Sequence, residues 1–131
     1  MKIRLGLSFY TDDGERFFGE CPYRLLRGVQ ELGSLHASTQ RMKMAYTKAF
    51  YMVKRAEVAL GFPLIQRTIG GKGGGGSVLT PQAEELLTRY ESYRDACGSM
   101  AEQLYQEHFS EFLPPPSAGD GEEGLRQNHA D

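Results

Sequence analysis

The chain has 131 residues, of which 40% are hydrophobic, and its formal net charge at pH 7 is -2. This length suits one domain with a modest core and some tail. No stretch approaches the roughly 20 apolar residues that a membrane span needs, and no signal peptide precedes the first predicted strand, so we expect a cytoplasmic protein with no membrane partner.

Residues 2–19 predict a β-hairpin. Polar and apolar residues alternate from Lys2 to Tyr10, which is the period-2 pattern of a strand with one buried face. Turn-forming residues follow at Thr11–Glu15. Arg16–Gly19 is the expected return strand.

Three helices are predicted next, in tandem. The first runs from Tyr23 to Leu32 and ends at Gly33. Ser34 is the expected N-cap of a short second helix. The connection at Lys43–Ala45 leaves room only for a tight turn, and the third helix is expected from about Ala45 to Leu60.

The predicted third helix has one apolar stripe and one polar face. The stripe has the spacing i, i+3, i+4, i+7 and is expected to face inward; it consists of Tyr46, Ala49, Phe50, Val53, Ala56 and Leu60. The opposite face carries Thr47, Lys48, Tyr51, Lys54 and Arg55. As the second helix of a helix-turn-helix, it has the chemistry of a recognition helix, whose first turn reaches base edges and whose later cations reach phosphates.

A glycine-rich segment separates two predicted strands. Six glycines and Lys72 make up residues 70–76, between the apolar run Pro63–Ile69 and a short strand at Ser77–Leu79. Glycine has no side chain to pack. Six glycines at one tip therefore favour a site where another backbone comes very close. We interpret this hairpin as a DNA-contacting wing; a flexible surface linker is the alternative. A P-loop is disfavoured because Lys72 is followed by glycine rather than by Ser or Thr at a helix start.

A long helix is predicted after the wing, with Thr80 as N-cap and Pro81 as first helical residue. Its apolar residues recur every three or four positions for about thirty residues, so its distal half favours a two-fold dimer. The alternative is a helix that folds back on its own domain. The expected dimerisation residues are Leu86, Leu87, Tyr90, Tyr93, Cys97, Met100 and Leu104. Prolines at 114–116 end the helix, and the acidic tail after them is predicted to be disordered.

Charge is segregated along the chain. Residues 40–81 hold seven basic residues and one acidic residue, whereas residues 82–131 hold three basic and eleven acidic residues. Because the field at a contact surface is local, the overall charge of -2 does not exclude nucleic-acid binding. Chance clustering on a solvated face is the alternative explanation.

There is no carboxylate pair, nucleophile–base set or metal-ligand spacing, so we expect no enzyme activity, no metal and no cofactor. Cys21 and Cys97 have no companions, and His36, His108 and His129 are expected to be surface or partly packed histidines.

A set of short motifs resembles the N-terminal DNA-binding domain of the ModE family of molybdate-responsive regulators, nearly collinearly from residue 2 to about 95. The motifs are Phe18-Gly19-Glu20, Leu25-Leu26, Glu31–Leu35, Met44-Ala45-Tyr46 with Ala49-Phe50, Gly61–Ile65, Gly70–Gly75 and Leu79-Thr80-Pro81. The Gly-Ser-Leu turn and the Leu-Thr-Pro helix start are also similar to LysR-type winged helices. The resemblance implies that the third helix reads the major groove, that the glycine hairpin is the wing and that the long helix dimerises.

Three positions depart from the family pattern. Lys43 stands where a small residue or Gly is usual, Ala45 where Ser is usual, and Phe50 where Trp is usual. Ala45 lacks a hydroxyl that could cap the recognition helix or touch a phosphate, so operator contacts are expected to be weaker or differently directed. Full-length ModE-type regulators have a C-terminal molybdate-binding domain, and we expect no molybdate site in this chain.

The sequence therefore predicts a mainly α fold with small β-hairpins (α+β): a winged helix-turn-helix domain at 1–80, a dimerisation helix at 81–113 and a tail at 114–131. The expected function is a dimeric bacterial transcription regulator that binds double-stranded DNA at an inverted repeat. The alternative is a winged-helix module for protein–protein interaction. The predicted DNA contacts are Ala45, Tyr46, Thr47, Lys48, Tyr51, Arg55, Arg67, Lys72, Gly73 and Gly74.

Overall fold

The computed structural model describes residues 3–68 and 76–112. The elements, in chain order, are β1 (Ser8–Tyr10), β2 (Arg16–Gly19), α1 (Glu20–Leu32), α2 (Leu35–Met42), α3 (Tyr46–Leu60), β3 (Ile65–Thr68), β4 (Gly76–Leu79) and α4 (Pro81–Phe109). Leu7–Glu91 form one compact unit, and the described residues before and after it belong to a second.

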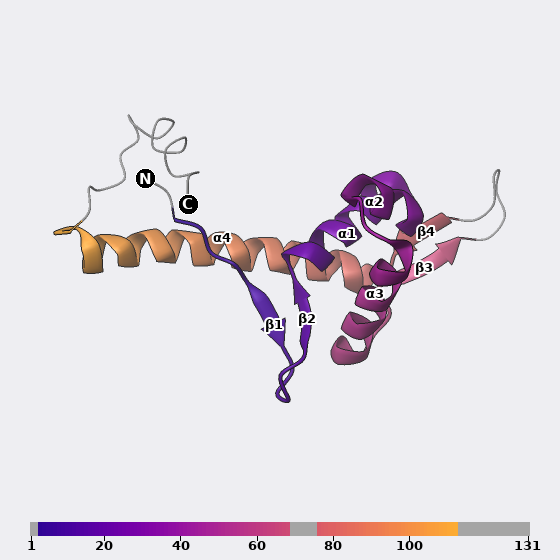
Figure 1. Ribbon diagram of the computed structural model, residues 1–131, viewed down its shortest axis with the longest axis horizontal. Helices are drawn as coiled ribbons and strands as arrows, with labels where there is room; N and C mark the ends of the chain where they lie inside the picture. Colours follow the sequence, from indigo (N-terminus) through magenta and orange to yellow (C-terminus); the bar gives the residue numbers. More distant parts are fainter. Residues whose placement is uncertain (1–2, 69–75, 113–131) are drawn as a thin grey trace. The chain divides into compact units, whose positions relative to one another are not determined.

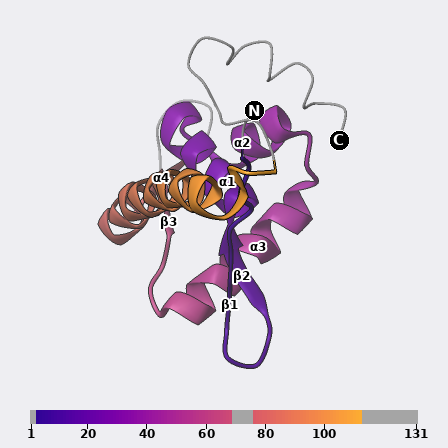
Figure 2. The same ribbon diagram turned by 90° about the vertical axis from the view of Figure 1, so that its left-hand side faces the viewer.

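The first unit is a winged helix-turn-helix, as predicted. Helices α2 and α3 form the helix-turn-helix, and the antiparallel pair β3–β4 follows directly as the wing (Figure 1). A separate hairpin, β1–β2, precedes α1. Figure 2 shows α1, α2 and α3 from a second direction. The fold class inferred from the sequence, mainly helical with two small hairpins, is confirmed.

The N-terminal hairpin is shorter than the alternation of residues suggested. β2 has the predicted bounds, but β1 is confined to Ser8–Tyr10, and the described residues before it are not in a strand. The reason lies in the pairing: Ser8 is opposite Gly19, where β2 ends and α1 begins. Residues before Ser8 have no partner strand, and without ladder hydrogen bonds the alternation cannot produce a strand.

Helix termini follow local hydrogen-bond chemistry. α1 begins at Glu20, three residues earlier than predicted, because Pro22 falls in its first turn, where the missing N–H costs nothing. It ends at Gly33, whose φ of 84° is left-handed and whose N–H donates to the carbonyl of Val29. Ser34 caps α2 as expected: its Oγ accepts from the backbone N–H of Ala37 at 2.9 Å.

The core of the first unit is drawn from all four helices and both hairpins. The two strands β2 and β4 contribute Phe18 and Leu79 to it. The other core residues that are no more than 9% exposed are Tyr23, Leu25, Leu26, Val29, Leu35, Ala49, Val53, Ala56, Leu64, Ala83, Leu87 and Tyr90. Each large aliphatic side chain buried in this way contributes about 1.5–3 kcal/mol to the free energy of unfolding. This core fixes the face that α3 turns to solvent.

Helices α1 and α2 pack closely enough to require a glycine. A Cβ added at Gly28 would lie 2.0 Å from Oγ of Ser38, and that hydroxyl donates to the carbonyl of Leu25 at 2.7 Å. Ser38 is fully buried, so neither partner can move into free space.

Replacing Gly28 by alanine is therefore expected to lower the free energy of unfolding by about 1–3 kcal/mol, the range for an overpacked core, despite the better helix propensity of alanine. Urea denaturation monitored by circular dichroism measures this change. Gly98→Ala is the matched control, because a Cβ at Gly98 in α4 meets no atom within 4 Å and should be neutral or stabilising. Equal effects of the two substitutions would contradict the packing argument.

The start of α4 is joined to the first unit by polar contacts. Oγ1 of Thr80 accepts from the backbone N–H of Ala83 at 3.1 Å and donates to the carbonyl of Pro63 at 2.8 Å. The Tyr90 hydroxyl donates to Glu20 at 3.2 Å. The prediction that Thr80 caps the long helix and that Pro81 opens it is confirmed.

A buried phenol links α1 to the same stretch of α4. The Tyr23 hydroxyl donates to the carboxylate of Glu91, which also pairs with Arg27 at 2.7 Å. Burial, together with the neighbouring Glu91 carboxylate, raises the pKa of Tyr23 above its usual value. A raised pKa keeps this hydroxyl protonated as a donor throughout the neutral range. The stability that it confers is fully present below the unfolded value near 10 and is lost as the pH rises from there through the raised pKa of the folded protein.

The second unit contains the remainder of α4. Its described side chains include exposed apolar residues at Tyr93, Met100, Leu104 and Phe109, whereas Tyr105 is 7% exposed. Over the ranges that the structure describes, no helix combines the length and the apolar character needed to cross a membrane.

Candidate nucleic-acid interface

The solvent side of α3 has an uncharged ridge. Ala49, Val53 and Ala56 are buried in the core. Opposite them, at helical positions four and seven residues apart, lie Thr47, Tyr51 and Val58, which are exposed, Tyr51 to 60%. We call these three residues the uncharged ridge. It is the part of α3 that points most directly away from the core.

Cations lie on both sides of the uncharged ridge. Lys48 and Arg55, seven residues apart, are on one side of α3, and Lys54 is on the other. Arg67 of β3 lies on the same side as Lys54, since both line one hollow. All four are exposed, and we call them the flanking cations.

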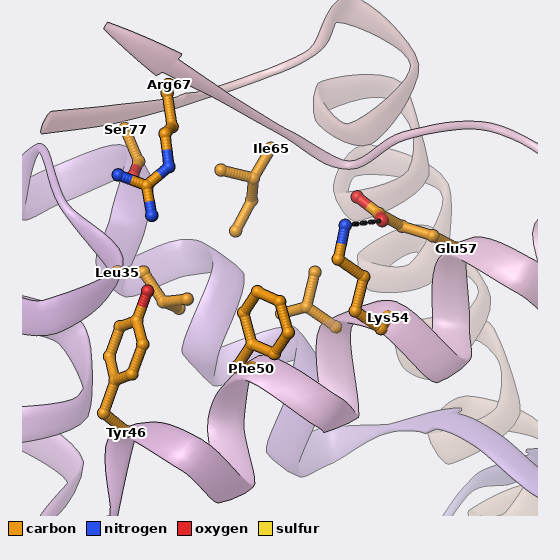
Figure 3. Close-up of a pocket in the computed structure, with 9 residues that line it drawn as sticks. Leu35, Tyr46, Phe50, Lys54, Glu57, Ile65, Arg67 and Ser77 are labelled. Atoms are coloured by element: carbon orange, nitrogen blue, oxygen red, sulfur yellow. Dashed lines mark ion pairs between the residues drawn. The ribbon is translucent and has the colours of Figure 1, made fainter.

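The hollow lies between α3 and the β3–β4 hairpin and has a volume of about 140 Å³ (Figure 3). Arg67 points from β3 towards α3, while Tyr46, Phe50 and Lys54 rise from α3 on the facing side. The remaining lining residues are Leu35, Val53, Glu57, Ile65 and Ser77. Helix α3 and the wing therefore present their side chains to one shared space.

Tyr46 and Phe50 correct the predicted inward stripe. They are 38% and 37% exposed, because they face this hollow rather than the closed core. Their rings contact each other with centroids 6.4 Å apart, and the Phe50 ring also contacts that of Tyr51 at 5.6 Å. Lys54 Nζ lies 5.4 Å from the centroid of Phe50. The helix surface next to the wing is thus aromatic and cationic.

Glu57 ties α3 to the beginning of the wing. Its Oε2 accepts from the backbone N–H of Leu64 at 2.7 Å, and its Oε1 pairs with Lys54 Nζ at 3.5 Å. The backbone contact fixes where β3 starts relative to α3. Sequence reasoning missed Glu57 and Phe50 as site residues; the i, i+3 spacing of Lys54 and Glu57 is the signal that could have found the ion pair.

The other strand of the wing is anchored by backbone. The N–H of Ser77 donates to the carbonyl of Gly33 at 2.9 Å, and a Cβ at Gly76 would lie 2.6 Å from that same oxygen. The end of β4 that is farther from the base of the hairpin is therefore held against Gly33, in the turn between α1 and α2. The predicted contacts Lys72, Gly73 and Gly74 lie outside the described residues.

Comparison with known proteins finds ModE proteins among the relatives of this chain. No protein-family model matches the chain. The transcriptional regulator ModE of Haemophilus influenzae is 37% identical over 68 residues, which cover 52% of this chain and 27% of that protein. The molybdenum transport protein ModE of Herbaspirillum seropedicae is 36% identical over 73 residues, 56% of this chain and 25% of that protein. The N-terminal half of this chain is ModE-like.

Two further proteins are similar to this chain. The molybdenum-pterin-binding protein MopB of Rhodobacter capsulatus is 35% identical over 66 residues, 50% of this chain and 24% of that protein. This chain thus spans about a quarter of the length of these relatives. The full-length structure of the Vibrio cholerae virulence activator AphB, a member of the LTTR family, is also similar, with a TM-score of 0.42 and 18% identity. The match covers 66% of this chain and 28% of the AphB chain.

Two departures from the ModE pattern have structural explanations. Lys43 caps α2 with φ 56° and ψ 47°, a left-handed conformation in which an L-residue costs about 1–2 kcal/mol and glycine costs little. That geometry explains why a small residue is usual there. Ala45, the N-cap of α3, makes no side-chain hydrogen bond, so the first turn of this ModE-like helix keeps backbone N–H groups for other acceptors.

The residues expected to dimerise fall into two groups. Leu87 and Tyr90 are 1% and 3% exposed in the core of the first unit, so their side chains are occupied within their own chain, and Leu86 is half-buried against the same core. The near-heptad pattern alone could not show this. Tyr93, Met100 and Leu104 are 45–52% exposed, and Cys97 is a half-buried free thiol.

In the parts of the chain that the structure describes, no three His, Cys, Asp or Glu side chains are grouped in a way that could hold a metal ion.

His36 belongs to the aromatic side of the α3 surface. Its ring centroid is 5.8 Å from that of Tyr46, and its Nε2 lies 3.4 Å from Nε2 of Gln40.

Proposed function

We propose that this chain is a sequence-specific DNA-binding transcription regulator of the ModE type that acts as a homodimer. The observation that carries the proposal is that the uncharged ridge of α3 lies between two pairs of flanking cations. One of these four cations, Arg67, belongs to the adjacent wing. The similarity to the transcriptional regulator ModE of Haemophilus influenzae supports the same function.

The geometry matches a duplex. An α-helix with its side chains is about 10–12 Å across, and the major groove of B-DNA is about 12 Å wide. With α3 in the groove, the uncharged ridge faces the base edges. Lys48 and Arg55 then face one phosphate backbone, and Lys54 and Arg67 face the other. The hairpin beside α3 is directed at the neighbouring sugar-phosphate chain.

The dimer is proposed from α4. Tyr93, Cys97, Met100 and Leu104 follow one another at intervals of four, three and four residues, the spacing of a coiled-coil seam. A two-fold dimer has two copies of α3, and we expect them to bind the two half-sites of an inverted repeat, for which the general spacing is about 34 Å.

Selection from a random duplex pool tests the proposal. We expect the purified protein to enrich a motif with two inverted half-sites, and its affinity for that motif to fall as salt rises, because phosphate contacts release counterions. Sedimentation equilibrium of the same preparation should show a dimer. If no motif is enriched, or if binding does not depend on salt, the proposal is contradicted and a protein-interaction module becomes the better explanation.

A further inference from the structure

The uncharged ridge has an unusual composition for a surface that faces bases. Arg and Lys make paired hydrogen bonds with guanine, and Asn and Gln make them with adenine. The sequence of α3 contains neither Asn nor Gln, and its three cations, Lys48, Lys54 and Arg55, lie on the flanks rather than on the ridge. The ridge itself offers a methyl-bearing hydroxyl, Thr47, and an aromatic ring, Tyr51.

These two side chains occupy the positions from which a recognition helix reads bases. The N-terminal residues of such a helix contact base edges. Thr47 is the second residue of α3, and Tyr51 lies one turn later on the same face. Both are opposite the buried stripe, so neither is covered by its own chain.

The Tyr51 ring has an aromatic neighbour on its own helix. It contacts the ring of Phe50 edge-on, with an interplanar angle of 76°, and Phe50 in turn lies under Lys54 Nζ. A tyrosine side chain has only two rotatable bonds, so it loses little conformational entropy on binding. This favours close apolar contact over adaptable hydrogen bonding.

Resting on the proposed function, we infer that Thr47 and Tyr51 recognise thymine through its C5-methyl group. Thymine is the base that presents a methyl in the major groove, and the methyl of threonine and aromatic rings are suited to contact it. The specificity of the half-site then lies mainly in apolar contacts with T·A pairs, while the flanking cations hold the duplex without reading it.

Replacing single thymines by deoxyuridine tests this inference on the selected duplex, since the replacement removes the methyl and leaves pairing and phosphates intact. At the thymine facing Thr47 and at the one facing Tyr51, we expect affinity to fall about fourfold for each methyl removed, from the transfer free energy of one carbon. Other thymines in the same duplex should change affinity by less than about twofold.

A matched pair of variants assigns the contact to Thr47. Thr47→Ser removes the side-chain methyl and keeps the hydroxyl, so the effect of deoxyuridine should disappear at one thymine and persist at the other. Thr47→Val keeps a methyl and removes the hydroxyl, and should restore the effect at that thymine. Circular dichroism of each variant checks that α3 is still folded.

The outcomes separate this inference from the proposed function. In one outcome, the protein binds the selected duplex in a salt-dependent manner, and deoxyuridine changes its affinity at no position. This result overturns the thymine-methyl inference and leaves the proposed function standing. Replacing guanine by 7-deazaguanine could also lower the affinity. If Lys48→Ala abolishes that loss, Lys48 reads guanine, and the thymine-methyl inference is overturned. Failure to bind any duplex overturns the proposed function itself.

Discussion

Replacing all four flanking cations, Lys48, Lys54, Arg55 and Arg67, by alanine is expected to weaken binding of the selected duplex about a thousandfold at 0.1 M salt. Each exposed cation facing a phosphate contributes about 1 kcal/mol, and four such contributions amount to about three powers of ten. The slope of log K against log salt concentration should become shallower by about 3.6. Fluorescence anisotropy at several salt concentrations measures both quantities.

Two-charge variants make the prediction more specific. One variant combines Lys48→Ala with Arg55→Ala, and the other combines Lys54→Ala with Arg67→Ala. Each should reduce the slope by about 1.8, because each removes two of the four phosphate contacts. The matched control removes two exposed arginines that lie outside the flanks, Arg16 of β2 and Arg89 of α4. Should the control weaken binding as much as either pair, overall charge rather than the α3 surface would govern affinity, and the proposed docking geometry would fail.

Phe18→Ala is expected to lower the free energy of unfolding by about 3–5 kcal/mol, the range for a buried phenylalanine. Phe18 is 1% exposed, its ring meets that of Tyr90 edge-on at 5.3 Å, and it lies 6.1 Å from the ring of Phe9. It therefore joins the N-terminal hairpin to the start of α4. The melting temperature of a domain of this size should fall by about 15–30 °C, measured by thermal denaturation.

Phe112 provides the control for that substitution. It is 78% exposed, so Phe112→Ala should change the free energy of unfolding by less than about 0.5 kcal/mol. A small loss at Phe18 would mean that the N-terminal hairpin and α4 are stabilised independently of each other. In that case the aromatic contact with Tyr90 would not be what holds the hairpin.

Local hydrogen-bond chemistry explains which parts of the fold could be predicted. Ser34 and Thr80 have side chains that cap helices, and Gly33 and Gly61 adopt the left-handed φ that ends them. Each of these roles depends on a few neighbouring residues. The helix-turn-helix, its boundaries and the wing strands were accordingly readable from the sequence.

Features that depend on distant partners could not be read in this way. β1 is short because β2 ends at Gly19, and no pattern within residues 2–10 contains that information. Phe50 is exposed because the wing leaves a hollow beside α3. Tyr90 is buried because α1 and the N-terminal hairpin pack on it. A periodic stripe shows that a face is apolar, but it does not show what covers that face.

The same limit applied to the candidate site. The cations of α3 were identified from the sequence, but their division between two flanks, and the approach of Arg67 to the side of Lys54, follow only from the folded chain. The role of Glu57 in fixing the start of β3 depends on a hydrogen bond to the backbone of Leu64, seven residues away, which no helical spacing predicts.

The bond between the N–H of Ser77 and the carbonyl of Gly33 bears on which substitutions β4 tolerates. Because this contact is made by main-chain atoms, it does not depend on the side chain at position 77. Exposed residues of the strand can therefore change without loss of that bond, whereas Leu79, which is 6% exposed, is fixed by the core. Gly76 is fixed as well, since any larger residue would push the strand off its support.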